Sequence, residues 1–194
     1  MTATRVHLTR TFIHTFAQTL VFATWMVYQI QVIGLDALQL VLIGTAMEVT
    51  IFLFEIPTGV LADVYSRRLS VIIGTFLMGV GFLIMAAFPV FIAALVSQFF
   101  WGIGFTFTSG AYDAWMVDEV GQEKAGAAFI RGNQVGRIAG LLGIIISTAL
   151  ATISLNLPIY AGGALQLVLA MLLTAIMPEH GFTPTPREER SSWR

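Results

Sequence analysis

The stretch of sequence that decides the fold is Glu55-Ile-Pro-Thr-Gly59-Val-Leu-Ala-Asp63-Val-Tyr-Ser-Arg67-Arg68. It ends one long apolar segment and begins another, and the turn between them carries an acidic side chain and a pair of arginines. Charges in so short a turn are typical of a chain that leaves a bilayer and enters it again. The stretch therefore predicts two membrane-spanning helices joined by a tight turn, and its arginines indicate the side of the membrane.

The composition supports this interpretation over the whole chain. Hydrophobic residues make up 57% of the sequence and charged residues 11%, with a mean hydropathy of +0.83. Because a soluble domain has about 25% charged residues, this balance predicts an integral membrane protein. The net charge of −1, with no basic patch outside the connecting segments, argues against a nucleic-acid partner. The absence of cysteine excludes disulfides and thiolate metal ligands.

Six apolar segments are long enough to cross a bilayer, which takes about 20 residues per helix. Short breaks containing glycine, proline or charged residues separate most of them, and the only long connector is the polar segment 112–130. The first apolar run is too long for a signal peptide, so we expect it to be retained as a span. The predicted spans are 11–33, 38–61, 69–88, 90–111, 131–152 and 157–177.

The basic residues predict the orientation of these spans. All ten fall on the same side of the predicted topology, and the opposite connecting segments contain none. Lysine and arginine concentrate in cytoplasmic loops, so we expect this side, with both termini, to be cytoplasmic. The basic residues are Arg5, Arg10, Arg67, Arg68, Lys124, Arg131, Arg137, Arg187, Arg190 and Arg194.

Two motifs resemble those of the major facilitator superfamily (MFS) of transporters. The turn after the second span resembles the family pattern Gly-x-x-x-Asp-(Arg/Lys)-x-Gly-Arg-(Arg/Lys), and it departs from that pattern at Val64 and Ser66. The end of the fourth span, Ser109-Gly-Ala-Tyr-Asp113-Ala-Trp115-Met-Val-Asp118, is similar to that of drug-efflux-like bacterial members. The positions that match the turn motif are Gly59, Asp63, Arg67 and Arg68.

The resemblance implies a fold and a function. The fold is an all-α integral membrane bundle of six transmembrane helices, arranged as two inverted three-helix repeats that form the N-terminal half of the transporter. The chain then divides into a cytoplasmic N-terminus (1–10), the bundle (11–177) and the start of a cytoplasmic linker between halves (178–194). The implied activity is efflux of small organic molecules by alternating access across a bacterial inner membrane, with protons as the coupling ion.

The same resemblance leaves the partner of this chain open. A six-helix half needs an opposing wall, which a missing C-terminal six-helix half or a second copy of the chain would supply. The alternatives are a remnant that does not transport and a membrane scaffold or partner protein. The other partners that the resemblance implies are the lipid bilayer and the transported molecule. It implies no cofactor.

The turn motif has two interpretations. In the family, the aspartate of this motif forms a cytoplasmic latch with the other half, which makes Gly59, Asp63, Arg67 and Arg68 candidate latch residues. A carboxylate near a helix N-terminus is stabilised by the helix dipole, and a glycine allows another helix to approach closely. The other interpretation is that the arginines only anchor a tight turn.

Two carboxylates lie inside the second predicted span. Seven residues separate Glu48 from Glu55, so both project from the same face of a helix. A carboxylate in a membrane span is costly and by default faces a cavity or a partner. We expect Glu48 to be the site of a proton or of a cationic substrate, with a neutral or hydrogen-bonded acid packed within the bundle as the alternative. We expect a structural role for Glu55, which precedes Pro57 and could pair with Arg137.

Polar and aromatic side chains form stripes on the first and fourth predicted spans. Mixed stripes of this kind suit a cavity for amphipathic organic molecules, and helices 1 and 4 line the pathway in the family. The alternative is that these side chains form hydrogen bonds between neighbouring helices. In many proton-coupled members an arginine stands where this chain has Gln98. The stripe residues are Gln18, Trp25 and Gln29 on the first span, and Gln98 and Trp101 on the fourth.

Further charges surround the fourth and fifth spans. Asp113, Asp118, Arg131 and Arg137 are candidates for a cytoplasmic charge network with the turn motif, and we expect Asp113 to pair with one of the paired arginines. The alternative is that they are solvated loop charges. The three histidines have no metal-ligand spacing. No phosphate loop or nucleophile motif occurs, so the sequence predicts neither a metal site nor an enzyme.

Overall fold

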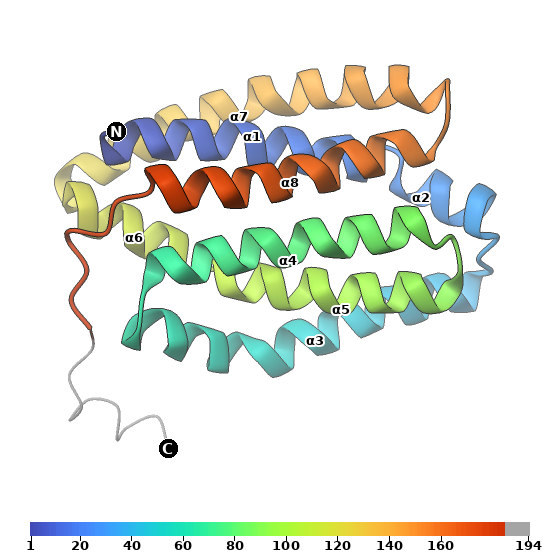
Figure 1. The fold of residues 1–194 in the computed structure, drawn as a ribbon, viewed down its shortest axis with the longest axis horizontal. Helices are drawn as coiled ribbons and strands as arrows, with labels where there is room; N and C mark the ends of the chain where they lie inside the picture. The colour runs from blue at the N-terminus through green and yellow to red at the C-terminus, as the bar shows by residue number, and fades with distance from the viewer. Residues whose placement is uncertain (185–194) are drawn as a thin grey trace.

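The computed structural model describes residues 1–184, and every regular element among them is helical (Figure 1). Six stretches in this part of the chain are long and apolar enough to cross a membrane, which confirms the predicted all-α membrane fold. The first such stretch comprises α1, α2 and η1, and the fourth comprises α5 and α6. The elements are α1 (Ala3–Phe22), α2 (Trp25–Tyr28), the π-helical η1 (Gln29–Ile33), α3 (Ala37–Val64), α4 (Arg67–Ala87), α5 (Phe91–Thr108), α6 (Ala111–Val120), α7 (Gln122–Ala151) and α8 (Asn156–Ile176).

Local side-chain chemistry sets the ends of α3 and α4. Asp36 accepts a hydrogen bond from the backbone N–H of Gln39 at 2.8 Å, and the Gln39 side chain accepts one from the backbone of Asp36 at 3.1 Å. This reciprocal pair satisfies two N–H groups that the helix itself cannot. Ser66 accepts from the N–H of Leu69 at 2.8 Å and caps α4 in the same way. The polar breaks in the hydropathy pattern thus supply the caps.

The helices extend beyond the predicted apolar spans at one end of the bundle. The first helix begins at Ala3 rather than at residue 11, and the fifth spanning helix begins at Gln122 rather than at 131. The polar connector expected over 112–130 is helical except at Gly121, whose φ of 80° separates α6 from α7. Residues such as glutamate, lysine, glutamine and alanine favour a helix in water as well as in lipid. Hydropathy therefore marks where a span is apolar, whereas the helix continues past it.

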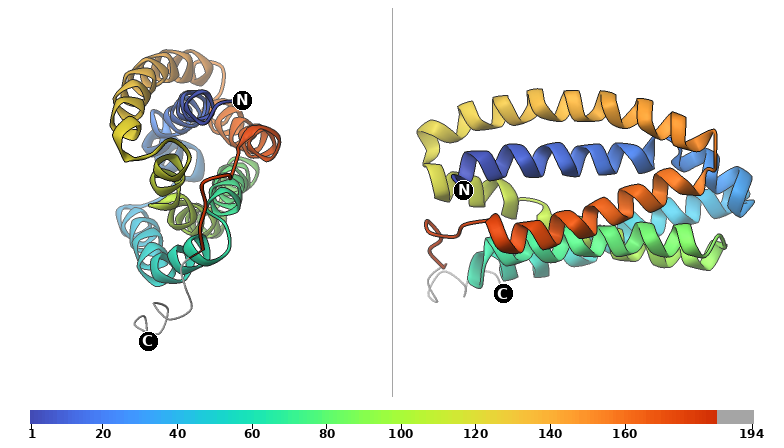
Figure 2. Two further views of the ribbon diagram at one scale, coloured as in Figure 1. Left: turned by 90° about the vertical axis from the view of Figure 1, so that its left-hand side faces the viewer. Right: turned by 45° about the horizontal axis from the view of Figure 1, so that its top comes forward.

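The spanning helices form an open crescent when viewed along their length (Figure 2). Its order is α7, α1, α8, α4, α5, α3, with α4 and α8 at the back and α3 and α7 at the two edges. The packing of α7 on α1 repeats that of α3 on α5, and α4 packs on α8 between them. Exchanging α1, α3 and α4 for α5, α7 and α8 reproduces the arrangement, as expected for two inverted three-helix repeats.

Small residues bring the inner and back helices into close contact. A β-carbon at Gly104 of α5 would lie 2.6 Å from the carbonyl oxygen of Gly74 in α4, and one at Gly79 would lie 3.0 Å from that of Gly163 in α8. A side chain at Gly104 cannot fit without moving the backbone, and one at Gly79 would require its neighbours to shift. Membrane helices associate through such small-residue contacts because lipid tails give no hydrophobic drive for helix pairing.

The edge helices present apolar faces to the outside of this chain. In the most apolar 18-residue segment of each helix, only 11% is buried in α3 and 17% in α7, whereas 56% is buried in α4. Phe52 on α3 is 80% exposed, and Ile145 on α7 is also exposed. Apolar faces of this size contact either lipid or another protein.

Candidate functional site

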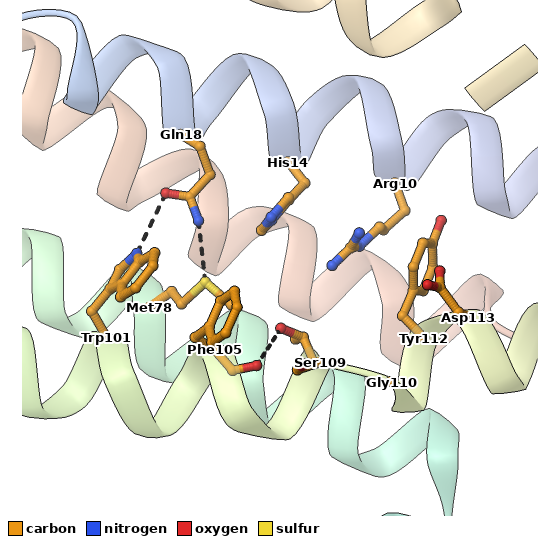
Figure 3. A pocket seen from close by; sticks show the side chains of 11 residues that line it. Arg10, His14, Gln18, Met78, Trp101, Phe105, Ser109, Gly110, Tyr112 and Asp113 are labelled. Atoms are coloured by element: carbon orange, nitrogen blue, oxygen red, sulfur yellow. Dashed lines mark hydrogen bonds between the residues drawn. The ribbon is translucent and has the colours of Figure 1, made fainter. Parts of the chain in front are cut away.

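A cavity of about 330 Å³ lies between α1, α5 and the start of α6, with Met78 of α4 at its base (Figure 3). We call it the arginine cavity. It combines charged, amide and aromatic side chains, which is the mixture that fixes small organic ligands. Its lining residues are Arg10, His14, Gln18, Met78, Trp101, Phe105, Thr108, Ser109, Gly110, Tyr112 and Asp113.

The α1 wall of the arginine cavity is one stripe of polar side chains. Arg10, His14 and Gln18 follow one another at a spacing of four residues, so they stack on a single helix face (Figure 3). The Gln18 amide donates to Met78 Sδ at 3.2 Å and accepts from Trp101 Nε1 at 3.5 Å. These contacts bring the predicted stripe residues Gln18 and Trp101 together across the cavity.

Buried hydrogen bonds hold the rest of this wall in place. His14 Nδ1 lies 3.1 Å from the amide nitrogen of Gln166, which is fully buried in α8. The Tyr112 hydroxyl lies 2.7 Å from His7 Nδ1 and 3.3 Å from Thr11 Oγ1. The α1 side and the α6 side of the cavity are therefore both held in place by hydrogen bonds, which limits how far the two sides can move toward each other.

Arg10 is the most unusual group in the cavity. Its side chain is buried, with 8% of the residue exposed, and its guanidinium carbon lies 3.9 Å from the centre of the Tyr112 ring. Arg10 Nε is buried and has no hydrogen-bond partner. The ion pairs among residues 1–184 do not include Arg10, although Asp113 lines the same cavity. A buried guanidinium that lines the cavity and has no ion-pair partner is a candidate to bind an acceptor that enters the cavity.

The other predicted stripe residues line a second cavity, which we call the apolar cavity. It has a volume of about 210 Å³ and lies between the first span, α3 and α5. Two buried amides, Gln29 and Gln98, are its polar lining residues, and the amide nitrogen of Gln29, a residue that is 2% exposed, has no hydrogen-bond partner. Phe22 and Trp101 are in edge-to-face contact, with ring centres 5.8 Å apart, between the two cavities. The lining is Phe22, Trp25, Met26, Gln29, Leu40, Ile43, Gly44, Met47 and Gln98.

Glu48 and Glu55 both lie on the exposed side of α3. The structure thus corrects the alternative of an acid packed within the bundle, because neither carboxylate is buried. Glu48 follows Gly44 by one helical turn, which places it on the helix face that borders the apolar cavity. The suggested pairing of Glu55 with Arg137 is wrong, because α3 and α7 lie at opposite edges of the crescent (Figure 2).

The turn motif forms an ion-pair cluster at the charged end of the bundle. Arg67 pairs with Asp63 at 3.3 Å and also with Asp118 of α6. The expected pairing of Asp113 with Arg67 or Arg68 is wrong in the part of the chain that the structure describes. Because α6 continues as a helix past Asp113, the carboxylate that reaches Arg67 is Asp118, more than one turn further on.

Arg68 and the segment after α8 complete this end. Arg68 Nη2 donates to the carbonyl of Thr174 at 2.6 Å. The carboxylate of Glu179 accepts from the backbone N–H of Arg68 at 2.9 Å and from the Ser66 hydroxyl at 2.8 Å. Gly59 lies one turn before Asp63 and has no atom within 4 Å of where its β-carbon would be. Arg187, Arg190 and Arg194 of the predicted linker lie outside the described residues.

Arg131 and Arg137 are exposed on α7, and neither forms an ion pair with another described residue. They therefore stay apart from the cluster around Arg67. Arg137 instead lines a third hollow, of about 500 Å³, with Asn133 on α7 and Thr11 and Thr15 on α1. This hollow lies between α7 and α1.

Sequence reasoning missed Arg10, His14 and Gln166 as site residues. Arg10 was interpreted only as a topological charge, and the histidines were considered only as metal ligands. The four-residue spacing of Arg10, His14 and Gln18 was the signal that could have found the first two. Gln166 could not be found from spacing, because its contact with His14 joins the first and last spans.

Comparison with known proteins adds evidence that is independent of this geometry. A family model described as Major Facilitator Superfamily matches residues 10–194. The chain is also similar to the uncharacterized MFS-type transporter YxaM of Bacillus subtilis (strain 168), with 27% identity over 137 residues. That match covers 69% of this chain and 33% of the relative. The chain therefore aligns with about a third of the length of the curated relative.

Proposed function

Because the chain belongs to the Major Facilitator Superfamily, it is a membrane transporter sequence rather than an enzyme, and we propose that it forms the N-terminal half of a secondary active transporter. In this proposal, small organic molecules bind between two halves that rock about a central site. The transport direction is efflux, and protons drive it.

The observation that carries the proposal is the open crescent. The arginine cavity lies against α1 and α5, and the apolar cavity lies against the first span, α3 and α5. The helices α1 and α5 are the two inner helices of the crescent (Figure 2). Both cavities are partly open to the outside of this chain, so a second wall would be needed to enclose a substrate in either of them. The exposed apolar faces of α3 and α7 flank the opening and are suited to contact that wall.

We assign the charged end of the bundle to the cytoplasm of a bacterial cell, in the plasma (inner) membrane. The support is the distribution of basic residues, since Arg67 and Arg68 lie at the same end as Lys124 and the start of α1. On this assignment Gly59, Asp63, Arg67 and Arg68 form the cytoplasmic latch. The open space over Gly59 leaves room for a helix of the opposing half.

We assign proton coupling to Glu48. The support is its place at about mid-length of α3, beside the apolar cavity and away from the ion pairs of the charged end. A carboxylate exposed at this depth faces the opposing half or a water-filled path in the complete transporter. Glu55 lies about 10 Å nearer the charged end, at 1.5 Å per residue, and takes a structural role.

The test is transport into inverted membrane vesicles with an imposed proton gradient. The substrate panel contains aromatic cations, neutral compounds and anions of matched size. Glu48→Gln is expected to abolish gradient-driven uptake, whereas Glu55→Gln, which removes the same charge on the same helix face, is expected to retain most of it. If no compound moves in any form of the protein, the proposed function fails.

The same assay separates the two sources of the second wall. Vesicles containing this 194-residue chain alone are compared with vesicles containing the chain joined to a C-terminal half of six further spans. Transport by the chain alone indicates a dimer of halves, and transport only by the longer protein indicates a six-helix half. The exposed apolar faces of the edge helices favour either assembly over a lone bundle.

A further inference from the structure

We propose that the arginine cavity binds the anionic group of an amphipathic organic molecule, and that Arg10 is the residue that binds it. The ligand class is a carboxylate attached to a flat apolar body. The inference rests on the proposed transport function, because it names the class of substrate that the concave side would take. It departs from the expectation of cationic substrates, which rested on the carboxylate of Glu48.

The first step is the charge of Arg10. A guanidinium does not lose its proton in a protein, so this side chain brings a fixed positive charge into a buried position. The face of Tyr112 stabilises part of that charge through a cation–π contact at 3.9 Å. No carboxylate among residues 1–184 forms an ion pair with it, and Arg10 Nε is left without an acceptor. The guanidinium therefore has an aromatic partner but no directly paired anion.

The second step is the position of Arg10 in the cavity. Its side chain projects from α1 into the space enclosed by α5 and α6, next to His14 (Figure 3). The planar guanidinium offers two parallel donors, a geometry that matches a carboxylate. Trp101 and Phe105, stacked with ring centres 5.5 Å apart and planes 15° apart, form an aromatic side of the same cavity. An aromatic carboxylate can therefore meet its charge partner and its apolar partner at once.

The third step is the opposing charge of Asp113. This carboxylate lies at the exposed rim of the same cavity without an ion pair to Arg10. It weakens the attraction of Arg10 for an anion, because a like charge nearby is repulsive. The proposal thus makes two predictions of opposite sign: removing Arg10 lowers the affinity for an anion, and removing the charge of Asp113 raises it.

The test is equilibrium dialysis of three probes against the purified protein in phosphatidylcholine nanodiscs, with empty discs as the blank. The probes are 2-naphthoate, 2-naphthamide and 2-naphthylmethylammonium, which share one ring system and differ in charge. Wild-type protein is expected to bind naphthoate at least about tenfold more tightly than the amide, as for hydrogen bonds to a charged group. Arg10→Gln is expected to remove that preference and to leave binding of the amide unchanged.

Three further variants keep the test decisive. Arg5→Gln removes an exposed arginine from the same helix and is expected to change nothing. Arg10→Lys retains the charge without the two-pronged geometry and is expected to retain part of the preference, which covers the case that Arg10→Gln does not fold. Asp113→Asn is expected to increase naphthoate affinity a few-fold. Loss of all three probes together in Arg10→Gln, or no change for naphthoate, overturns the proposal.

A lipid headgroup could supply the same anionic chemistry, so the dialysis is repeated with phosphatidylglycerol in the discs. Retention of Arg10-dependent naphthoate binding supports a free organic anion, and complete loss of that binding points to the lipid and overturns the proposal. The outcomes also separate this inference from the proposed function. If the protein transports cations or neutral compounds but does not bind naphthoate, the proposed function stands and the anion site is overturned. If it binds naphthoate through Arg10 but transports no compound, the anion site stands and the proposed function is overturned.

Discussion

A back helix and an edge helix of the crescent can be equally apolar and yet buried to very different extents. The most apolar segments of α8 and α3 both have a mean hydropathy of 1.9, whereas 39% of the first and 11% of the second are buried; for the back helix α4 the values are 2.3 and 56%. The difference follows the glycines. Gly74, Gly79 and Gly81 of α4 lie against neighbouring helices, while Gly44 and Gly59 of α3 have open space around them. In lipid, close packing rather than hydropathy decides which helix lies inside.

The largest effect is expected from adding a side chain at a glycine contact between α4 and its neighbour α5. Gly104→Val is expected to destabilise the bundle by about 3 kcal/mol or more, because its β-carbon would lie 2.6 Å from the Gly74 carbonyl oxygen and 2.9 Å from Met78 N. The measurement is thermal unfolding of the purified protein in detergent. Gly59→Val, with nothing within 4 Å, is the matched edge variant and is expected to shift the midpoint little.

Gly59→Val also has a second readout. If the latch assignment is right, this variant folds normally but loses transport, since the added side chain fills the space that a helix of the opposing half would occupy. A variant that transports normally would falsify the role of Gly59 in the latch while leaving the packing comparison intact.

A medium effect is expected where an edge helix is tied to the back of the crescent. Arg67→Ala is expected to cost about 1.5–3 kcal/mol, the range for hydrogen bonds to charged groups, because it breaks contacts to both Asp63 and Asp118. A double-mutant cycle with Asp118→Ala isolates the pair. A coupling energy near zero would mean that the contact between Arg67 of α4 and Asp118 of α6 adds nothing to stability.

The smallest effect is expected on the exposed face of α3. Phe52→Ala is expected to change the stability of the isolated chain by less than about 0.5 kcal/mol, because the side chain is 80% exposed. The same denaturation assay on the complete transporter sharpens the comparison. A much larger loss there would show that Phe52 lies in a protein interface, and an unchanged value would assign this face to lipid.

Hydropathy and motif spacing predicted the six spanning helices and the turn at residues 63–68, because membrane insertion depends on local composition. They could not predict that 112–130 is helical, since a polar helix gives no hydropathy signal. Nor could they select Asp118 over Asp113 as the partner of Arg67, which depends on the rotation of α6.

The candidate site was predicted in part. Gln18 and Trp101 do meet across a cavity, but Trp25, Gln29 and Gln98 line a different one. A stripe in the sequence shows which side chains point from the same face of a helix. The contact of Phe22 with Trp101, which lies between the two cavities, depends on packing between helices. Arg10 was missed as a site residue because a basic residue near a span end satisfies a topology rule without further explanation.

The interleaved packing of the two repeats has a consequence for synthesis. The first helix packs mainly on α7 and α8, and α3 packs mainly on α5, so the first three spans have few contacts with one another. They enter the bilayer before their partners exist. At about 5–20 residues per second, the ribosome needs on the order of 10 s to make the segment from Phe91 to Ile176. During that interval Arg10 and Gln18 lack their contacts from α5 and α6, and the nascent chain depends on the insertion machinery or on lipid to shield them.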